Sequence, residues 1–447
     1  MKYGLIVIVL AAMLATAMPA LAAGASEVSG FWNIAEFCGA GPLCVGLKER
    51  IRQEIYNNLD VNDATNDSTN YYRTRSQLYA EWKISEFDTA RIQLTNEFRN
   101  YLVTPTASTE YLKNGNPGEI FFDHTYVSSK EIMESPVSVT AGRFELLNQY
   151  GENFIFADGT PQDGSRSMFF DAVRGSLNID DNNTVDLLYI SNDKKDKKMP
   201  RINKQDAQTL NTSNDSGPAV IWKAKLSDEL YLEPYYVWKN EEYSTTLESD
   251  LHTFGALAKY KMDDMTLRAQ LAYQTGDYGT QDRSGMGGYL YVDKTFKDMT
   301  LKPACTLGAL YLSGDDPSTT TEIEGWNPLY SRFPGWNELY AYVLKGETGQ
   351  NGYWTNTIMF TAKTKLKVND KFTTELALDY ILACEKAANS LGTTKGFSPN
   401  ATFSYAFSKT VTGRYQLLYF MPGDYYQAGT TDADNAFFTR VELALSF

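Results

Sequence analysis

Apolar and polar residues alternate with a period of two along most of this chain. Between residues 71 and 84, Leu78 and Trp82 share one face, whereas Arg73 and Arg75 share the other. A helix would instead repeat its apolar residues every three or four positions. The alternating segments run to roughly 10–13 residues, which is the length expected of tilted membrane strands and longer than most strands of soluble proteins. The pattern therefore predicts an all-β membrane protein.

About 18 segments of this kind can be placed, an even number as in bacterial single-chain barrels. They span residues 47–59, 71–84, 89–103, 118–131, 136–147, 167–180, 183–192, 218–226, 229–239, 250–262, 265–275, 287–296, 299–313, 352–366, 371–384, 397–408, 411–421 and 435–447. Short turns alternate with long polar segments, which span 60–70, 104–117, 148–166, 193–217, 240–249, 276–286, 314–351, 385–396 and 422–434. We therefore predict a closed antiparallel transmembrane β-barrel with short periplasmic turns, long extracellular loops and both of its ends on the periplasmic side.

The first 46 residues do not follow the strand pattern. Lys2, an apolar stretch over 4–17 and the small residues Ala20 and Ala22 predict a signal peptide at 1–22. A single transmembrane anchor is the alternative, but no charged stop-transfer patch follows this stretch. We expect residues 23–46 to form an irregular periplasmic segment, and residues 47–447 to form the barrel. Cys38 and Cys44 lie close together in this segment, and the sequence leaves open whether they are bonded.

Composition narrows the function. The chain has 41 Lys and Arg against 55 Asp and Glu, a net charge of −14, which argues against a nucleic-acid partner. Only two His are present and no Gly-x-Ser-x-Gly motif occurs, so we predict no catalytic set and no enzyme. Clustered carboxylates in the polar segments are more often solvated than metal-bound, so we predict neither a metal nor a cofactor.

The polar face of the first strands, which we assign to the lumen, is rich in arginine. The predicted lumen residues are Arg50, Arg52, Arg73, Arg75, Arg91, Glu97, Arg99, Arg143, Glu145 and Arg174. Guanidinium groups keep their charge and can bind carboxylates through two parallel hydrogen bonds. Rings of such groups in a pore favour anions. The pattern predicts a channel with an anionic small molecule or polysaccharide as its solute.

Three stretches of the chain resemble known motifs. They are Gly142-Arg143-Phe144-Glu145-Leu146 followed by Tyr150-Gly151-Glu152, then Phe170-Asp171-Ala172-Val173-Arg174, and then Ser313-Gly314-Asp315-Asp316 followed by Trp326-Asn327-Pro328-Leu329-Tyr330. Their order and spacing resemble the alginate-export family of outer-membrane porins. Phe144 stands where that family usually has Gln, and Trp326 and Tyr330 stand where it has Phe. The resemblance implies a pore with an arginine-rich path for uronate polymers, and it marks Asp171, Gly314, Asp315 and Pro328 as candidate loop-motif residues.

Two other interpretations remain open. Arg–Glu ladders could simply stiffen the wall of a general or cation-tolerant diffusion porin. Alternatively, the chain could be a plugged receptor or structural barrel. The segment 314–351 bears on both, because loops longer than about 12–15 residues are usually functional. We expect this segment to fold partly over or into the mouth of the barrel and to restrict access.

These features predict a protein of the bacterial outer membrane. Its expected partners are outer-membrane lipid, lipopolysaccharide and the barrel-assembly machinery. The last strand supports the third of these, because Val441, Leu443, Leu445 and the terminal Phe447 share one face. This pattern resembles the C-terminal signal by which outer-membrane proteins are recognised for assembly.

A first prediction concerns this signal. Deleting Phe447, or replacing it with a charged residue, should lower the yield of folded barrel in the outer membrane, because the terminal aromatic residue would no longer be recognised. Heat-modifiable migration of outer-membrane fractions on gels measures that yield. An unchanged amount of heat-modifiable protein would contradict the prediction.

Overall fold

The computed structural model describes residues 42–61, 68–103, 119–159, 169–202, 208–427 and 433–446. The predicted signal peptide, most of the segment 23–46 and Phe447 lie outside the described residues. Cys44 is disulfide-bonded, whereas Cys305 and Cys384 are free.

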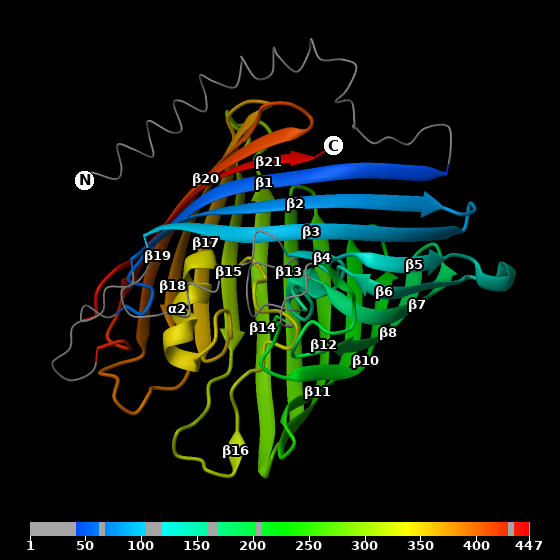
Figure 1. Ribbon diagram of the computed structural model, residues 1–447. Helices are drawn as coiled ribbons and strands as arrows, with labels where there is room; N and C mark the ends of the chain where they lie inside the picture. The colour runs from blue at the N-terminus through cyan, green and yellow to red at the C-terminus, as the bar shows by residue number, and fades with distance from the viewer. Residues whose placement is uncertain are drawn as a thin grey trace.

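The described chain forms one closed antiparallel barrel of 18 wall strands (Figure 1). These strands are β1 (Leu43–Asn57), β2 (Thr69–Lys83), β3 (Asp88–Val103), β4 (Ile120–Phe122) with β5 (Thr125–Ser129), β6 (Val137–Phe144), β7 (Phe170–Asp180), β8 (Asn183–Asn192), β10 (Asn214–Lys225), β11 (Leu230–Ser244), β12 (Leu247–Met262), β13 (Met265–Tyr278), β14 (Gln281–Thr295), β15 (Ala304–Leu312), β17 (Thr357–Lys367), β18 (Phe372–Leu382), β19 (Thr394–Ala406), β20 (Val411–Pro422) and β21 (Ala436–Ser446). β4 and β5 both pair with β3 and together make one interrupted wall strand.

Two further strands have only two residues each and belong to loops. β9 (Arg201–Ile202) pairs with β4, and β16 (Glu322–Ile323) pairs with β14. Single turns of 3-10 helix, η2 (Ile132–Glu134) and η3 (Gly151–Asn153), lie in connections beside the wall. Pairing of the last strand with the first closes the barrel, with Arg52 opposite Glu442 and Glu54 opposite Arg440.

Side chains on the wall follow the alternation that the sequence predicts, with the polarity reversed relative to a soluble protein. Leu78 and Leu271 are 50% and 63% exposed on the outer face, whereas their neighbours Gln77 and Gln270 are buried inside. Lipid takes the place of water around the apolar face. The sheet is closed, so its backbone groups pair between strands and leave no open edge in the membrane.

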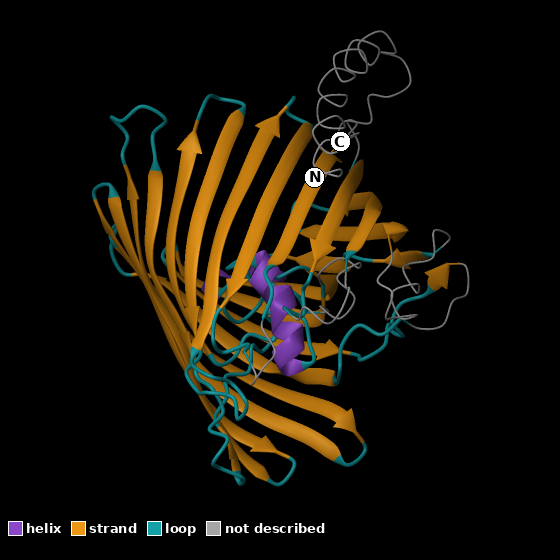
Figure 2. Ribbon diagram, turned by 90° about the vertical axis from the view of Figure 1, so that its left-hand side faces the viewer, coloured by secondary structure: helices purple, strands orange, loops and turns teal. Residues whose placement is uncertain are grey.

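One α-helix, α2 (Glu338–Thr348), lies inside the barrel in the connection between β15 and β17 (Figure 2). Asn337 begins this helix by accepting a hydrogen bond from the backbone N–H of Tyr340 at 2.9 Å. Gly349 ends it in the left-handed conformation, at φ 74°, which glycine adopts without strain. No helix of the described chain is long and apolar enough to span a membrane.

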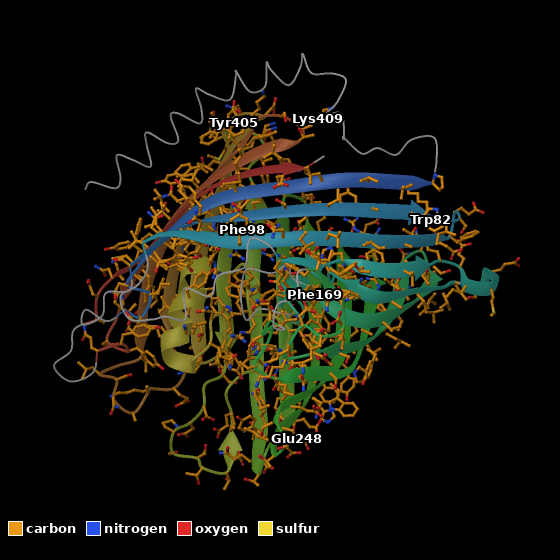
Figure 3. All side chains as sticks on the ribbon, viewed as in Figure 1. Trp82, Phe98, Phe169, Glu248, Tyr405 and Lys409 are labelled. Carbon is orange, nitrogen blue, oxygen red and sulfur yellow. The ribbon has the colours of Figure 1, made fainter. Side chains whose placement is uncertain are left out.

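Two of the predicted long loops are wrong. Tight turns at residues 245–246 and 279–280 join β11 to β12 and β13 to β14, in place of loops at 240–249 and 276–286. Glu248, at the start of β12, marks this end of the β11–β12 hairpin in Figure 3. The strand ends escaped prediction because polar residues occupy both of their faces, so the apolar–polar alternation disappears there while the hydrogen-bonded ladder continues.

A second prediction tests the lipid-facing wall. Leu271→Arg should lower the free energy of unfolding by about 2–4 kcal/mol, because Leu271 lies in the middle of β13 on the lipid face. Met265→Arg is the matched control on the same strand and face, near the strand end, where we expect a loss of about 0–1 kcal/mol. Urea titration of barrels refolded in lipid vesicles measures both values. Equal losses at the two positions would contradict this placement.

Candidate functional site in the lumen

Arginines from three consecutive strands lie side by side on the lumen face. Arg50 and Arg52 of β1 are opposite Arg75 and Arg73 of β2 in the strand register. Arg73 is in turn opposite Arg99 of β3. Neighbouring strands lie about 4.8 Å apart, so these side chains form a continuous cationic surface. We call the lumen-facing cations of β1–β3 the arginine track; they are Lys48, Arg50, Arg52, Arg73, Arg75, Arg91 and Arg99.

Carboxylates hold part of this track. Glu97 of β3 binds Arg73 of the adjacent strand β2 at 2.5 Å, and it binds Arg50 of β1, one strand further along the wall, at 3.0 Å. Glu54 binds Arg52 at 2.5 Å. These carboxylates fix the guanidinium groups in place, but each is shared or matched by further arginines. The pairs therefore order the track while neutralising only part of its charge.

Further members are held by tyrosines. Arg91 binds Glu81 at 3.2 Å and lies 4.2 Å from the centroid of the Tyr79 ring. Arg99 lies 5.1 Å from the centroid of the Tyr71 ring. Such stacking orients a guanidinium group without neutralising it.

Arg75 and Lys48 differ from the rest of the track. In the part of the chain that the structure describes, neither has a carboxylate within ion-pair distance. The Arg75 side chain is half-buried and Lys48 is exposed, so both face the open part of the lumen. Lys48 also interacts electrostatically with Glu145, which follows β6 on the far side of β3. These two cations are therefore the ones best placed to meet a solute.

Arg174 lies on the lumen face of β7. It donates a hydrogen bond to Gln149 Oε1 at 2.6 Å and lies over the Phe144 ring, with 5.6 Å to the centroid. Register pairing places it opposite Thr140 on β6. Arg174 thereby continues the row of cations beyond β3, close to the connection that follows β6.

The expectation that Arg143 shares this face is wrong. Arg143 is opposite Asp171, one position out of phase with the pair of Thr140 and Arg174, and so follows the lipid-facing residues of β6. Its guanidinium group binds Asp171 at 2.7 Å and Asp196 at 3.1 Å. It also donates to the Phe122 carbonyl at 2.9 Å. Arg143 lies next to the end of β6 at residue 144 and is only 1% exposed, so these oxygen partners surround its charge.

Two connections fold into the barrel and pack on each other. Phe154 and Phe156, between β6 and β7, contact Trp326 and Tyr330, between β15 and β17, with ring centroids 5.2 and 5.7 Å apart. The backbone N–H of Ala157 donates to the Tyr330 carbonyl at 3.0 Å. We call residues 145–159 and 313–356 the first and second inserted loops. The sequence indicated the second by its length, and the apolar run at 154–156 was the signal for the first.

These loops fill part of the lumen. Together with α2 they form a single buried apolar cluster with lumen-facing wall residues, among them Phe170, Ile190, Ile221, Val237, Leu251, Leu310 and Phe420, and also Tyr56 of β1 and Tyr71 of β2. Covering the arginine track with the same apolar surface would remove charges from water at a high energetic cost. We therefore expect the water-filled passage to border the track where its cations remain accessible, as at Arg75 and Lys48.

Ion pairs tie α2 to the wall at both of its ends. Glu338 binds Arg440 at 2.6 Å, and Arg440 also binds Glu54 at 2.8 Å, beside the arginine track. Near the other end, Glu347 binds Lys395 at 2.6 Å, and Lys395 is fully buried. Removing one member of a buried pair typically costs about 3–5 kcal/mol, so these contacts fix the helix across the lumen.

A buried cluster of charged residues on β10, β11 and β14 also holds the second inserted loop. Lys239 binds Asp215 at 3.1 Å and Glu241 at 2.8 Å, and it donates to the Leu329 carbonyl at 2.9 Å. Arg283 adds a contact to Glu241 at 3.3 Å. All four of these residues were missed, because the predicted long loops placed Asp215, Glu241 and Arg283 outside strands, and Lys239 fell at a strand end.

The motif residues shape the inserted loops. Asp315 accepts a hydrogen bond from the Glu324 backbone at 2.8 Å. A Cβ added at Gly314 would come within 2.3 Å of Asn356 Oδ1, so only glycine fits there. The Pro328 carbonyl accepts from the Ser331 backbone at 2.9 Å. Asp171 lies within β7, as the partner of Arg143. Gly314, Asp315 and Pro328 therefore fix the backbone of the second inserted loop. None of the four motif residues belongs to the arginine track.

A third prediction follows from Asp158 of the first inserted loop. Its Oδ1 accepts the backbone N–H groups of Arg332 at 2.6 Å and Phe333 at 3.1 Å, which joins the two loops. Burial raises the pKa of the Asp158 carboxyl to about 7. The Asp158 carboxyl therefore binds a proton more tightly when the loops are docked than when the side chain is exposed to solvent. Their stabilisation by Asp158 is complete below about pH 4 and is lost as the pH rises through about 7.

Hydrogen exchange over residues 326–336 measures this docking. Corrected for the intrinsic exchange rate, protection should fall by up to about tenfold per pH unit between pH 5 and 7 and then level off. Asp158→Asn keeps the shape of the neutral side chain and should make protection independent of pH in this range. A wild type with flat protection would contradict the assignment.

Comparisons with known proteins agree with this architecture. The model of the Alginate export family matches residues 42–439. The structure of OccAB1 from Acinetobacter baumannii aligns with a TM-score of 0.60 at 11% identity, covering 92% of this chain and 99% of that one. The structure of OpdK from Pseudomonas aeruginosa with vanillate aligns with a TM-score of 0.58 at 11% identity, covering 90% and 98%.

A comparison with curated protein sequences found no match. At such low identity the solved structures show the fold alone, which is that of outer-membrane porins. The family match covers most of the chain and carries the assignment further. The protein is a porin-type channel of the bacterial outer membrane, and it belongs to the Alginate export family.

Proposed function

We propose that this channel passes anionic solutes, of the uronate-type saccharide class, along the arginine track. The observation that carries the proposal is the pair of lumen cations Arg75 and Lys48, which have no carboxylate partner among the described residues, next to a row of arginines that carboxylates neutralise only in part. A passing carboxylate can exchange contacts from one guanidinium group to the next. Permanent charge and the planar fork of donors suit arginine to this task.

The family name supports a uronate-type solute, and one structural neighbour supports an anionic one. The family is named for alginate export, and OpdK was solved with vanillate. The main support for an anionic ligand of this chain is its own lumen residues, and the comparisons are secondary. The inserted loops confine the solute to the side of the lumen where the arginine track lies, so that the cations act at short range.

Wall stiffening is the competing role for the same arginines. Arg52, Arg73 and Arg50 each have a carboxylate partner and would serve that role equally well. Arg75 and Lys48 would not, since among the described residues they bind no carboxylate. Selectivity should therefore depend on Arg75 far more than on a surface cation.

A fourth prediction tests this dependence. At low salt the wild type should conduct anions better than cations of similar size, and Arg75→Glu should reduce or reverse that preference. The effect weakens at physiological salt, where the Debye length is about 8 Å. Reversal potentials of single channels in planar bilayers measure the preference.

The matched control is Lys409→Glu. Lys409 is exposed on the turn that joins β19 to β20 (Figure 3), so the variant changes the net charge equally without altering the lumen. Its ion preference should equal that of the wild type. A cation-selective wild type, or an Arg75→Glu variant with unchanged preference, would contradict the proposal. A barrel without conductance would instead indicate a plugged receptor.

A further inference from the structure

A cavity lies beneath the first inserted loop, between that loop and strands β11 and β12, away from β1–β3. It has a volume of about 470 Å³ and is lined by Asn148, Gln149, Tyr150, Gly151, Glu152, Tyr231, Glu233, Leu257 and Lys259. Small-molecule sites commonly measure about 300–1,000 Å³. We call this cavity the vestibule. It is large enough for one sugar unit, and its lining combines polar and apolar surface in nearly equal parts.

The vestibule has a preorganised wall. Glu233 is buried, and its carboxylate accepts the Gly151 N–H at 2.6 Å and the Tyr231 hydroxyl at 2.5 Å. The loop above it is held in sparsely populated backbone conformations, with φ values of 60° at Asn148, 49° at Glu152 and 68° at Asn153. Asn148 and Asn153 stabilise this backbone through reciprocal hydrogen bonds of 2.6 and 2.9 Å. Strain of this kind concentrates at ligand-binding sites.

Lys259 supplies the charge. Its ammonium group binds Glu152 at 2.7 Å, and the side chain is 35% exposed toward the lumen. An ammonium group carries three protons, so donors remain after this contact. Glu152 has a second cationic partner, Arg268, at 2.6 Å, and also accepts from Tyr289 at 2.9 Å. Lys259 can therefore turn toward an incoming carboxylate without leaving Glu152 unpaired.

The remaining groups suit hydroxyls. Gln149 and Asn148 line the cavity with amide groups, of which Gln149 Nε2 also donates to the Glu145 carbonyl at 2.6 Å and Asn148 Oδ1 accepts from Asn153 at 2.9 Å. The Lys259 ammonium lies over the Tyr231 ring, 5.8 Å from its centroid. Gln149 also accepts from Arg174 at 2.6 Å, which connects the vestibule to the lumen cation on β7. The cavity thus combines one accessible cation, amides and an aromatic ring with two carboxylates that already have partners: Glu152 binds Lys259 and Arg268, and Glu233 accepts from Gly151 and Tyr231. A carboxylate next to several hydroxyls matches the groups that remain.

We propose that the vestibule is a second solute-binding site, in which Lys259 binds the carboxylate of a single sugar-acid unit and the first inserted loop binds its hydroxyls. The solute class rests on the proposed function, whereas the site rests on its own geometry. The solute would occupy this site on the side of the arginine track beyond Arg174.

Binding of glucuronate to the folded, full-length barrel in detergent tests the site. Titration by saturation-transfer NMR should show saturable binding to the wild type, and glucose, which lacks the carboxylate, should bind more weakly. Lys259→Gln should raise the dissociation constant by about tenfold, which is the loss of one charge-assisted hydrogen bond. Lys259→Arg restores a cation and should recover most of the affinity.

Lys261→Gln is the matched control, because Lys261 is exposed two residues further along β12 and does not line the vestibule. Its affinity should equal that of the wild type. Heat-modifiable migration confirms that each variant is folded. No saturable binding to the wild type, or equal effects of Lys259→Gln and Lys261→Gln, would overturn the site. This measurement does not depend on ion preference, so a cation-selective channel would contradict the proposed function alone.

Discussion

Backbone hydrogen bonding in lipid is the constraint from which the rest of this structure follows. No water is available there, so every N–H and C=O group of a membrane strand must pair with a neighbouring strand, and the sheet must close. Closure by β1 and β21 assigns one face of each strand to lipid and the other to the lumen. Most charged residues of the wall collect on the second face, whereas Glu49 of β1 lies on the first, where it accepts a hydrogen bond from Ser76 at 2.7 Å. The architecture of the wall thus allows an arginine track on the lumen face, whatever the solute.

The lumen then has to satisfy two opposing demands. Apolar lumen residues of the wall, such as Ile221 and Leu310, need a partner that excludes water, and the inserted loops provide it. The charged face of β1–β3 needs water or counter-charges, because an unpaired buried charge is costly. The loops satisfy the first demand where they dock, and accessible cations such as Arg75 and Lys48 lie outside that cluster. This division is the basis for the proposed path along the charged wall.

Local patterns in the sequence predicted the wall well. The strand expected at 183–192 is β8 at the same residues, and the count of 18 wall strands is confirmed. Predictions failed where alternation carries no information. β14 begins six residues before its predicted start, because polar residues occupy both faces at that end. Arg143 was assigned to the lumen for its charge alone, although its register follows the lipid-facing residues of β6.

The docking of the two inserted loops was harder to predict from the sequence, for a different reason. Its contacts join residues far apart in the chain, such as Asp158 with Arg332 and Lys239 with the Leu329 carbonyl. No periodicity encodes a contact of that kind. The length of the second inserted loop indicated that it would enter the barrel, but the sequence offered no measure of where it would dock. The same limit applies to Glu152, whose cationic partners lie on β12 and β13.

Docking of the second inserted loop and the charge of the arginine track are physically coupled through Glu54. This buried carboxylate binds Arg52 of the track and Arg440 of β21, and Arg440 in turn binds Glu338 at the start of α2. If α2 moved away, Arg440 would lose one of its two carboxylates and draw more strongly on Glu54. Arg52 would then be less neutralised, and the track would become more cationic as the passage widened. A wider pore normally screens its wall charges more. The shared carboxylate would therefore oppose the loss of the proposed anion preference.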